Sequence, residues 1–357
     1  MRNKMQPKNL IPAWLSFSLA AAFVISGLTV TILAFLTIQE MLAAPLNPLD
    51  PFIAENGTTG DNVGVATLPP PVNLDEPIVL PEATPLPIFP MNEQRVTVLV
   101  MGIDRRPDEP FISRTDTMIV MSINPANNSA VMLSVPRDLY VEIPGFGRNR
   151  INTAFVYGSQ GNNPAAGAAL SMQTIEYNLG IPIDHYVLVD FSAVVRGVDA
   201  IGGIDVDVPF EIYDPEFPDM NYGYDPLYIP AGRQHLDGLL ALKYARTRHV
   251  DNDFGRAQRQ QQVILAVREK VLGLGVTQLL GQLPFLYQQL DDGVRTDLSL
   301  DQMLTLAQAA SEIPTENIRS EVIDYDYVVG HRTEEGASVL VMVNDKVAPL
   351  IAELFSQ

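Results

Sequence analysis

The sequence contains no cysteine, and this absence excludes several kinds of chemistry. Without a thiol the chain forms no disulfide, no zinc–thiolate site and no cysteine nucleophile. The absence is compatible with an oxidising compartment but does not assign one. At 357 residues the chain is long enough for one large domain with appendages. Its chemistry must therefore come from oxygen and nitrogen side chains.

Positive charge is also scarce, and lysine especially so. The formal net charge is −19, from 23 Lys and Arg against 42 Asp and Glu. Beyond residue 40, 17 of the 20 basic residues are arginine, and only Lys243, Lys270 and Lys346 are lysine. A domain this acidic is a poor candidate for non-specific nucleic-acid binding, so we expect no nucleic-acid partner.

The first 40 residues have the pattern of a membrane anchor. Residues 9–39 carry no charge, and their apolar core, residues 13–36, exceeds the ~20 residues that span a bilayer. Three basic residues precede it: Arg2, Lys4 and Lys8. The positive-inside rule then predicts a cytoplasmic tail at residues 1–12 and an extracytoplasmic location for the rest. The alternative is a cleaved signal peptide with its site at residues 41–44, but the apolar run is longer than a usual signal segment.

Residues 43–92 have a different composition, in which prolines recur and Gly, Asn and Asp fill much of the rest. This composition predicts an extended, partly polyproline linker with no packed structure, which holds the domain away from the membrane. The catalytic domain is expected at residues 95–357. Its core motifs occupy residues 96–272, and residues 273–357 form a C-terminal extension.

The domain combines apolar, β-branched runs with helical periodicity. Strands are expected at residues 96–103, 117–123, 130–135, 185–189 and 204–208, and a final strand and helix within 339–355. Helices are expected at residues 164–179, 192–200, 236–244, 256–272, 277–290 and 299–312. A turn at 124–128 joins two of the strands into a hairpin. This mixture predicts an α/β (α+β) fold with three α-β-α layers around a mixed sheet.

Arginine and aspartate are concentrated in two stretches separated by mostly apolar sequence. The first contains Asp104, Arg105, Arg106, Arg114, Asp116, Arg137 and Asp138. The second contains Arg246, Arg248, Asp253, Arg256, Arg259 and Gln260. An arginine-rich composition explains the Arg/Lys ratio but not this clustering. Arginine binds phosphate through two parallel N–H groups, and interleaved aspartates suggest a shared divalent metal. The two stretches together predict a pyrophosphate site.

Two carboxylates are candidate metal ligands. Asp104 follows the first predicted strand, and Asp116 directly precedes the next. Carboxylates at the ends of neighbouring strands can share one Mg²⁺, which takes one or two protein carboxylates with water and phosphate oxygens. Mn²⁺ is the alternative ion. Each aspartate alone would be an ordinary turn or cap residue, and the flanking arginines argue against that interpretation.

The second stretch includes the start of a predicted helix that Asp253 can cap. Arg256 and Gln260, at i and i+4, lie on one face near the helix N-terminus, which favours anions. That face continues through Ile264 and Val267, so it should point inward, where an arginine without an anion would be costly. Upstream, two arginines point the same way if the chain is extended there. They are Arg246 and Arg248.

The motifs resemble those of the LytR-CpsA-Psr family of cell-envelope glycopolymer transferases. They occur in the expected order across half the chain. The matching stretches are residues 98–104, 114–117, 133–138, 150–152, 154–155, 183–191, 199–209, 232–238 and 244–262. The single N-terminal anchor is shared as well. The joint match is specific, although no single stretch would be.

The resemblance implies a lipid-linked donor. Members of this family bind a polyprenyl (pyro)phosphate whose tail enters a hydrophobic tunnel, and they transfer the attached glycan phosphate to a hydroxyl of peptidoglycan. By the match, Asp104 and Asp116 are the Mg²⁺ ligands. The (pyro)phosphate contacts are Arg106, Arg114, Arg137, Arg246, Arg248, Arg256 and Gln260. Arg137, Asp253 and Arg256 take the catalytic roles, Asp253 either orienting arginine or assisting the acceptor. Arg105 departs from the family pattern and is expected to be an exposed neighbour.

Three other functions compete with transfer. A pyrophosphatase would use the same residues on polyprenyl pyrophosphate, with water as the acceptor. A binding module would hold lipid-linked precursors without turnover. A membrane-bound transcriptional regulator is disfavoured by the acidic charge, by the absence of a recognisable helix-turn-helix motif, and by the predicted topology.

Overall fold

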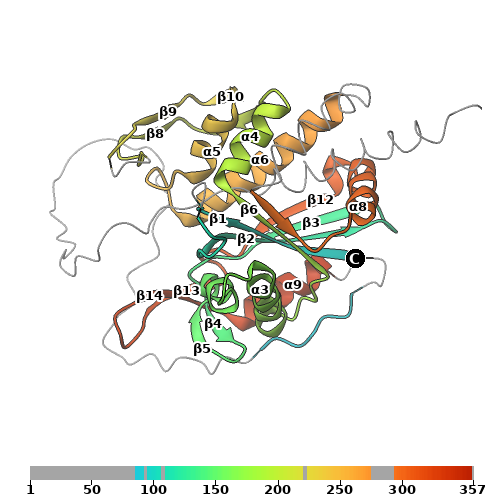
Figure 1. The fold of residues 1–357 in the computed structure, drawn as a ribbon, viewed down its shortest axis with the longest axis vertical. Helices are drawn as coiled ribbons and strands as arrows, with labels where there is room; N and C mark the ends of the chain where they lie inside the picture. Colours follow the sequence, from blue (N-terminus) through green and yellow to red (C-terminus); the bar gives the residue numbers. More distant parts are fainter. Residues whose placement is uncertain (1–84, 92–94, 106–108, 220–222, 275–292, 356–357) are drawn as a thin grey trace, which may run out of the picture.

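The structure is a computed structural model that describes residues 85–91, 95–105, 109–219, 223–274 and 293–355 (Figure 1). Several predictions fall outside these residues: the cytoplasmic tail at 1–12, the anchor at 13–36, most of the linker at 43–92, the helix at 277–290 and the position of Arg106. Within the described part of the chain, no helix is both long and apolar enough to cross a membrane.

A six-stranded mixed sheet forms the centre of the domain (Figure 1). In spatial order its strands are β11 (Val294–Thr296), β6 (His185–Asp190), β1 (Val96–Ile103), β2 (Thr115–Asn124), β3 (Ser129–Ser134) and β12 (Ile318–Val322). β1 is antiparallel to β2 and parallel to β6, while β3 is antiparallel to β2 and parallel to β12. The predicted hairpin and the predicted mixed sheet are thus confirmed.

Helices cover both faces of the sheet, which gives three layers (Figure 1). One layer contains α4 (Phe191–Ala200), α5 (Gly238–Arg246), α6 (Asp253–Leu274) and α8 (Leu300–Glu312). The other contains α2 (Ala154–Gly158), α3 (Pro164–Leu179) and α9 (Asn344–Phe355), with the 3₁₀ turn η1 (Ile151–Thr153) beside them. Alternate β1 residues serve the two cores: Val98 and Val100 face α4–α6, whereas Leu99 and Met101 face α3 and α9.

Four two-stranded antiparallel sheets surround this frame. They are β4 (Tyr140–Ile143) with β5 (Gly147–Arg150), β7 (Ile204–Val208) with β10 (Gly232–Leu236), β8 (Ile212–Asp214) with β9 (Leu227–Ile229), and β13 (Val328–Arg332) with β14 (Ser338–Met342). A second 3₁₀ turn, η2 (Thr315–Asn317), precedes β12. The β4–β5 and β13–β14 hairpins lie next to one another at one end of the molecule (Figure 1).

Capping side chains explain which predicted helix boundaries are right. The bounds of α3 agree with the prediction, because Asn163 accepts from the Ala166 amide at 3.2 Å and Gly180 ends the helix at φ 67°. The predicted capping box of Ser299 and Gln302 is also present. The predicted helix at 236–244 begins too early. Its first residue ends β10, and the Asp237 carboxylate accepts from the Leu240 amide at 2.8 Å, so α5 starts at Gly238.

The end of the predicted linker is packed, contrary to expectation. Residues 85–91 run beside α3, where Leu86 is buried and its amide donates to the Asn178 carbonyl at 3.3 Å. The Phe89 amide donates to the Gly180 carbonyl at 3.0 Å. A Cβ at Gly180 would lie 2.2 Å from the Pro87 carbonyl oxygen. The close approach and the positive φ both require glycine there, so the helix end and the segment fit each other.

The contact between α4 and α5 depends on the absence of a side chain at Gly238. A Cβ there would lie 2.1 Å from the Val195 carbonyl oxygen, a backbone atom that α4 holds in place. We expect Gly238→Ala to lower the free energy of unfolding by about 1–3 kcal/mol through overpacking. Gly273→Ala is the control, because a Cβ on that α6 residue meets nothing within 4 Å. Thermal and denaturant unfolding check this prediction, and equal stability of the two variants would contradict it.

Candidate functional site

Strand ends and one helix N-terminus meet at the same edge of the sheet. β1 and β3 end there, β2 begins there, and α6 begins above them (Figure 1). The β1–β2 register shifts at this edge: Gly102 pairs with Thr117 but Ile103 pairs with Thr115, which leaves Asp116 as the extra residue of a bulge. A bulge changes the direction of a side chain at a strand end. The sheet thus aims a carboxylate into the space beneath α6.

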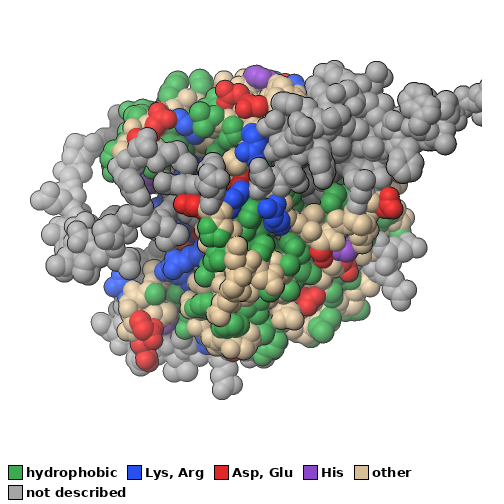
Figure 2. All heavy atoms as spheres, viewed as in Figure 1, with side chains coloured by type: hydrophobic (Ala, Val, Ile, Leu, Met, Phe, Trp, Pro, Cys, Tyr) green, Lys and Arg blue, Asp and Glu red, His purple; other side chains and the backbone are tan. Residues whose placement is uncertain are grey.

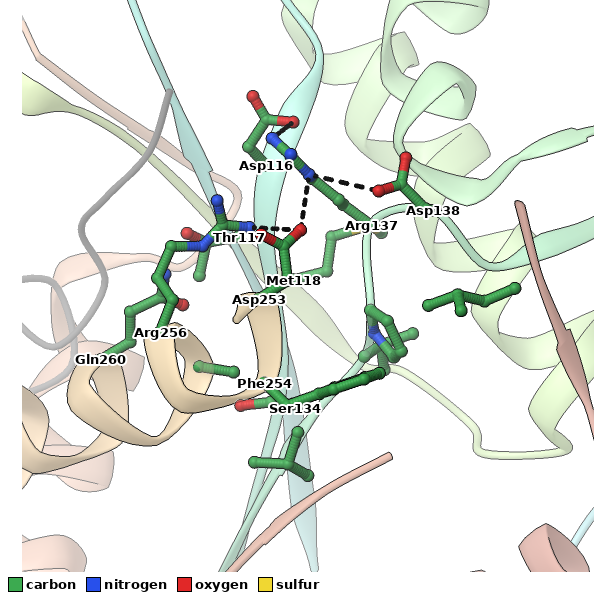
Figure 3. Close-up of a pocket in the computed structure, with 15 residues that line it drawn as sticks. Asp116, Thr117, Met118, Ser134, Arg137, Asp138, Asp253, Phe254, Arg256 and Gln260 are labelled. Carbon is green, nitrogen blue, oxygen red and sulfur yellow. Dashed lines mark ion pairs between the residues drawn. The ribbon is translucent and has the colours of Figure 1, made fainter. Parts of the chain in front are cut away.

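This edge holds a pocket that contains five of the predicted site residues (Figure 3). They are Asp116, Arg137, Asp253, Arg256 and Gln260. Asp138 also lines the pocket, and its apolar wall includes Phe254, Val322 and Leu340. The two arginine-rich stretches, distant in sequence, therefore share one cavity.

Arg137 is the centre of the charge network (Figure 3). Its Nη1 lies 3.2 Å from Asp116 Oδ1, and its Nε lies 3.2 Å from Asp253 Oδ2 and 3.5 Å from Asp138 Oδ2. Burial alone would lower the pKa of Arg137, but the charges of these three aspartates outweigh burial and raise it. Arg137 therefore stays protonated. Its ion pairs join β2, the loop that carries Arg137, and α6.

Asp116 is buried and is oriented by two donors. Its Oδ1 faces Arg137 and also accepts a hydrogen bond from Asn152 Nδ2 at 3.1 Å. Burial raises the pKa of Asp116, and the charges of Arg137 and Arg256 and the Asn152 hydrogen bond only partly offset this. Asn152 Oδ1 is itself buried without a hydrogen-bond partner among the described residues. The Asn152 amide was part of a matched motif, but the sequence did not show its role as the partner of Asp116.

Arg256 is a buried cation whose charge is only partly balanced. The residue is 5% exposed, its Nη2 lies 3.3 Å from Asp253 Oδ2, and its Nε has no hydrogen-bond partner within the described chain. The pKa of Arg256 is lowered to about 10, chiefly by burial; the charge of Arg137 adds to the lowering, and the charges of Asp253 and Asp116 oppose it. The guanidinium remains protonated near neutral pH. A desolvated cation in the first turn of α6 is well placed to bind an anion.

Asp253 is ionised because arginines surround it. Burial would raise the pKa of Asp253, but the charges of Arg256, Arg137 and Arg248 together lower it. The prediction that Asp253 caps the helix is wrong in detail. The side chain of Asn252 accepts from the amides of Phe254 and Gly255, at 2.9 and 3.0 Å, so Asp253 is the first helical residue. Its carboxylate is free to turn toward the pocket (Figure 3).

Arg259 belongs to the scaffold, although it lies among the clustered arginines. Its Nε donates to the Tyr244 carbonyl at 3.1 Å, its Nη1 pairs with Asp251 at 2.6 Å, and its Nη2 donates to the Thr247 carbonyl. The side chain is almost completely buried. It therefore fixes the loop between α5 and α6, which carries Arg248.

A second residue that sequence reasoning missed fixes the same loop from the other side. Asp214, at the end of β8, is fully buried, and its carboxylate accepts from Thr247 Oγ1 at 2.6 Å and pairs with His249 Nδ1 at 2.9 Å. These two partners flank Arg248. No motif signals this contact, because Asp214 lies on a separate hairpin and meets the loop only in the folded chain.

The other predicted residues that the structure describes are not among those that line the pocket. Asp104 is half-buried directly after β1, and Arg114 is exposed directly before β2. Arg246 packs its guanidinium 4.6 Å from the Phe191 ring centre and 5.5 Å from that of Phe217. Arg248 is half-buried near Asp253 and Arg256 and contributes to their pKa shifts.

Arg105 is not the exposed neighbour that was expected. Its Nε and Nη2 contact Asp190 Oδ2 at 2.9 and 2.8 Å, and its guanidinium stacks 4.1 Å from the Phe111 ring centre. Asp190 is fully buried and also caps α4. Arg105 therefore compensates a buried carboxylate that the sequence did not single out.

Oxygen side chains of the kind that Mg²⁺ prefers lie at this edge. Asp104 and Asp116 lie at the paired ends of β1 and β2, and the uncompensated Asn152 oxygen is beside Asp116. Hard oxygen donors with few protein ligands fit Mg²⁺, which retains water and phosphate oxygens. In the part of the chain that the structure describes, no group of three or more His, Asp or Glu could hold a metal ion.

The fold and the pocket define an α/β domain with a recessed arginine–aspartate site suited to phosphate. The LytR_cpsA_psr family model matches residues 80–355, and the chain belongs to this family. The family resemblance inferred from the motifs is thus confirmed.

Relatives and solved structures support the same placement. The chain is 34% identical over 224 residues to the polyisoprenyl-teichoic acid–peptidoglycan teichoic acid transferase TagU of Enterococcus faecalis, which covers 60% of this chain and 66% of that protein. The Bacillus subtilis TagV structure aligns with a TM-score of 0.58 at 27% identity, over 74% of this chain and 99% of that one. A structure of TagT bound to LIIa-WTA aligns with a TM-score of 0.57 at 28% identity, over 73% and 90%.

The two buried arginines of α6 should respond oppositely to removal of their charge. Burial lowers the pKa of Arg256, whose Nε also lacks a hydrogen-bond partner among the described residues, whereas Arg259 is fully paired. We expect Arg256→Met to raise the free energy of unfolding of the ligand-free protein by about 1–3 kcal/mol, and Arg259→Met to lower it by about 3–5 kcal/mol. Denaturant unfolding near neutral pH measures both. Destabilisation by Arg256→Met of the same size as by Arg259→Met would assign Arg256 to the scaffold.

Proposed function

We propose that this protein is a glycan-phosphate transferase that moves a glycopolymer from a polyprenyl-pyrophosphate carrier to a peptidoglycan hydroxyl during cell-wall assembly. The observation that carries the proposal is the buried, incompletely compensated Arg256, next to Arg137 at the N-terminus of α6. The relatives, which are named as teichoic acid transferases, favour the same reaction. Because the chain spans 57–66% of the length of those relatives, their donor and acceptor are proposals for this protein.

The arginine cluster performs the electrostatic part of the reaction. The acceptor oxygen attacks the phosphorus that carries the glycan, the phosphorus–oxygen bond to polyprenyl phosphate breaks, and polyprenyl phosphate departs. Negative charge grows on the phosphate oxygens and on the departing group. Arg137 and Arg256, fixed in a recessed pocket before the reaction, stabilise that charge more as the bond breaks. Gln260, Arg248, Arg246, Arg114 and Arg106 supply the outer phosphate contacts.

Asp253 is the best-placed group to accept the acceptor's proton. It is ionised, it lines the pocket, and it is oriented by Arg137 at 3.2 Å and Arg256 at 3.3 Å. A lowered pKa makes it a weak base, so its contribution is greatest late in bond formation, when the hydroxyl has become acidic. The other role of Asp253, orientation of the two arginines, follows from the same contacts.

Asp104 and Asp116 would hold the metal ion, Mg²⁺ or alternatively Mn²⁺. When bound, the ion neutralises charge on the phosphate oxygens. Asn152 holds the Asp116 carboxylate in position, and Arg137 limits the negative charge at the site while it is free of metal.

The lipid and the membrane are further parts of the proposal. A polyprenyl chain needs an apolar channel, and the two apolar cores on either side of the sheet, bordered by α6 and α3, are the candidate walls of a lipid tunnel. The predicted anchor at 13–36 would hold the domain at the extracytoplasmic membrane surface, where lipid-linked donors and peptidoglycan meet. A pyrophosphatase and a non-catalytic binder of lipid-linked precursors are the competing functions of the same pocket, and an envelope-linked regulator is a further alternative.

Turnover of a glycan-loaded donor tests the proposal. We expect the full-length protein with peptidoglycan fragments and Mg²⁺ to release polyprenyl phosphate and to form a glycan-phosphate adduct, both read by mass spectrometry. Arg137→Ala should reduce the rate by at least about 100-fold, because it removes a charge that acts on the transition state. Arg319→Ala is the matched control, since that β12 arginine pairs with Glu353 on the surface.

The products separate the competing functions. Polyprenyl phosphate released with glycan phosphate and no adduct would identify a pyrophosphatase. Donor binding without release would identify a binder. Full activity of Arg137→Ala would refute the site assignment.

Metal dependence has its own test. We expect chelation to abolish turnover, with Mg²⁺ or Mn²⁺ restoring it, and Asp116→Asn to raise the Mg²⁺ concentration needed for half-maximal rate by about tenfold or more, through loss of ligand charge. Mn²⁺ binding followed by electron paramagnetic resonance gives a readout that is independent of activity. An unchanged Mn²⁺ affinity in Asp116→Asn would remove this residue from the metal site.

A further inference from the structure

A cationic and aromatic surface continues outward from the pocket along the β4–β5 hairpin. We name it the β4–β5 ledge, and it consists of Tyr140, Arg148 and Arg150. Tyr140 and Arg150 are direct cross-strand partners, and Arg148 lies two residues before Arg150 on the same face of the hairpin. All three side chains are half-buried. Figure 2 shows several Lys and Arg side chains between the α4–α6 layer and the α3 layer.

The ledge is joined to the pocket through one carboxylate. Asp138 lines the pocket, and its Oδ2 lies 3.5 Å from Arg137 Nε while its Oδ1 lies 3.2 Å from Arg150 Nε. Arg150 Nη2 also donates to the Ser338 carbonyl of β14 at 2.8 Å, which fixes the guanidinium against the neighbouring hairpin. A ligand that leaves the pocket past Asp138 therefore meets Arg150 and then the rest of the ledge.

Arg148 is the residue that points to a ligand. Its cross-strand partner is Glu142, yet it forms no ion pair with any residue that the structure describes. Its guanidinium instead stacks over the Tyr140 ring, 5.1 Å from the centre, and its Nε is buried without a hydrogen-bond partner. A guanidinium that rests on an aromatic ring is restrained without using its N–H groups, and those groups can bind phosphate through two hydrogen bonds.

We propose that the β4–β5 ledge binds a phosphodiester of the glycopolymer, beyond the pyrophosphate that reacts. This inference rests on the proposed function and specifies its donor as an anionic, phosphate-bearing glycan. Arg148 takes the phosphate, Arg150 adds positive potential next to the pocket, and Tyr140 supports Arg148 while its exposed edge contacts the sugar or polyol. A neutral glycan would gain little from Arg148, so the ledge selects donors that carry phosphate in the polymer.

Two synthetic donors of equal lipid test the ledge. Both carry a disaccharide on a short-chain prenyl pyrophosphate, and one is extended by several glycerol-phosphate units. For the full-length protein we expect Arg148→Ala to raise KM for the extended donor by about tenfold, equivalent to about 1.4 kcal/mol, and to leave KM for the unextended donor unchanged. The preference of the wild-type protein for the extended donor should weaken with added salt, and that salt dependence should diminish in the variant.

Controls separate recognition from folding and from chemistry. Arg148→Gln removes the charge with less change of packing, and Tyr140→Phe should retain the stacking and the preference. Arg233→Ala, an exposed β10 arginine paired with Asp205, is the matched surface control. The proposal would be overturned if the Arg148 variants changed KM by the same factor for the extended and the unextended donor. It would also be overturned if neither variant changed KM for either donor.

Binding of the same two donors, labelled with a fluorophore and followed by anisotropy, tests the ledge without turnover. If the wild-type protein binds the extended donor more tightly and Arg148→Gln removes the difference, the ledge is supported even where neither donor reacts. In that case the proposed transfer fails and the ledge inference survives. Equal wild-type affinities for the two donors would contradict it.

Discussion

The position of Arg137 among three carboxylates is the constraint on which the site depends. Asp116 comes from a bulge in β2, Asp138 follows Arg137 in the loop after β3, and Asp253 opens α6. One guanidinium thereby joins the sheet edge, the β3–β4 loop and the helical layer. With Arg256 and Arg248 close by, the cluster carries as many cations as anions before a ligand or a metal ion arrives. The site is thus assembled without substrate, at the cost of a desolvated Arg256.

The arginines of the second stretch divide into two groups that the sequence does not distinguish. Arg256 and Arg259 are three residues apart on α6, and both are almost fully buried. Arg259 uses its N–H groups on Asp251 and two backbone carbonyls, whereas Arg256 retains an unsatisfied Nε toward the pocket. Burial alone therefore does not identify a ligand-binding arginine. The distinguishing feature is how many of its donors the protein itself satisfies.

Much of the fold and the meeting of the two arginine-rich stretches could be predicted, because both follow from local rules. Apolar runs specified the central strands, and Asn163 and Ser299 specified helix starts. Residues at strand ends and at a helix N-terminus are expected at one edge, and Asp116, Arg137 and Arg256 do lie there. The partners Asn152 and Asp214 were not predictable in the same way, since each acts through a contact between elements distant in sequence. The misplaced start of α5 has a local cause, because the apolar residue Leu236 fits a strand end and a helix start equally well.

Arginines are held in different ways in the pocket and on the β4–β5 ledge. Inside the pocket, aspartates hold the arginines and keep the cluster stable without an anion. On the ledge, Asp138 pairs with Arg150, whereas Arg148 lies over the Tyr140 ring and forms no ion pair with a described residue, although Glu142 is its cross-strand partner. In the proposed reaction, a bound metal ion together with the arginines would exceed the charge of these carboxylates. A single guanidinium further out has no such excess, and an ion pair with a carboxylate would occupy the N–H groups that bind phosphate. Contact with the Tyr140 ring orders Arg148 without such an ion pair, which is the arrangement expected of a site that would recognise the polymer rather than react with it.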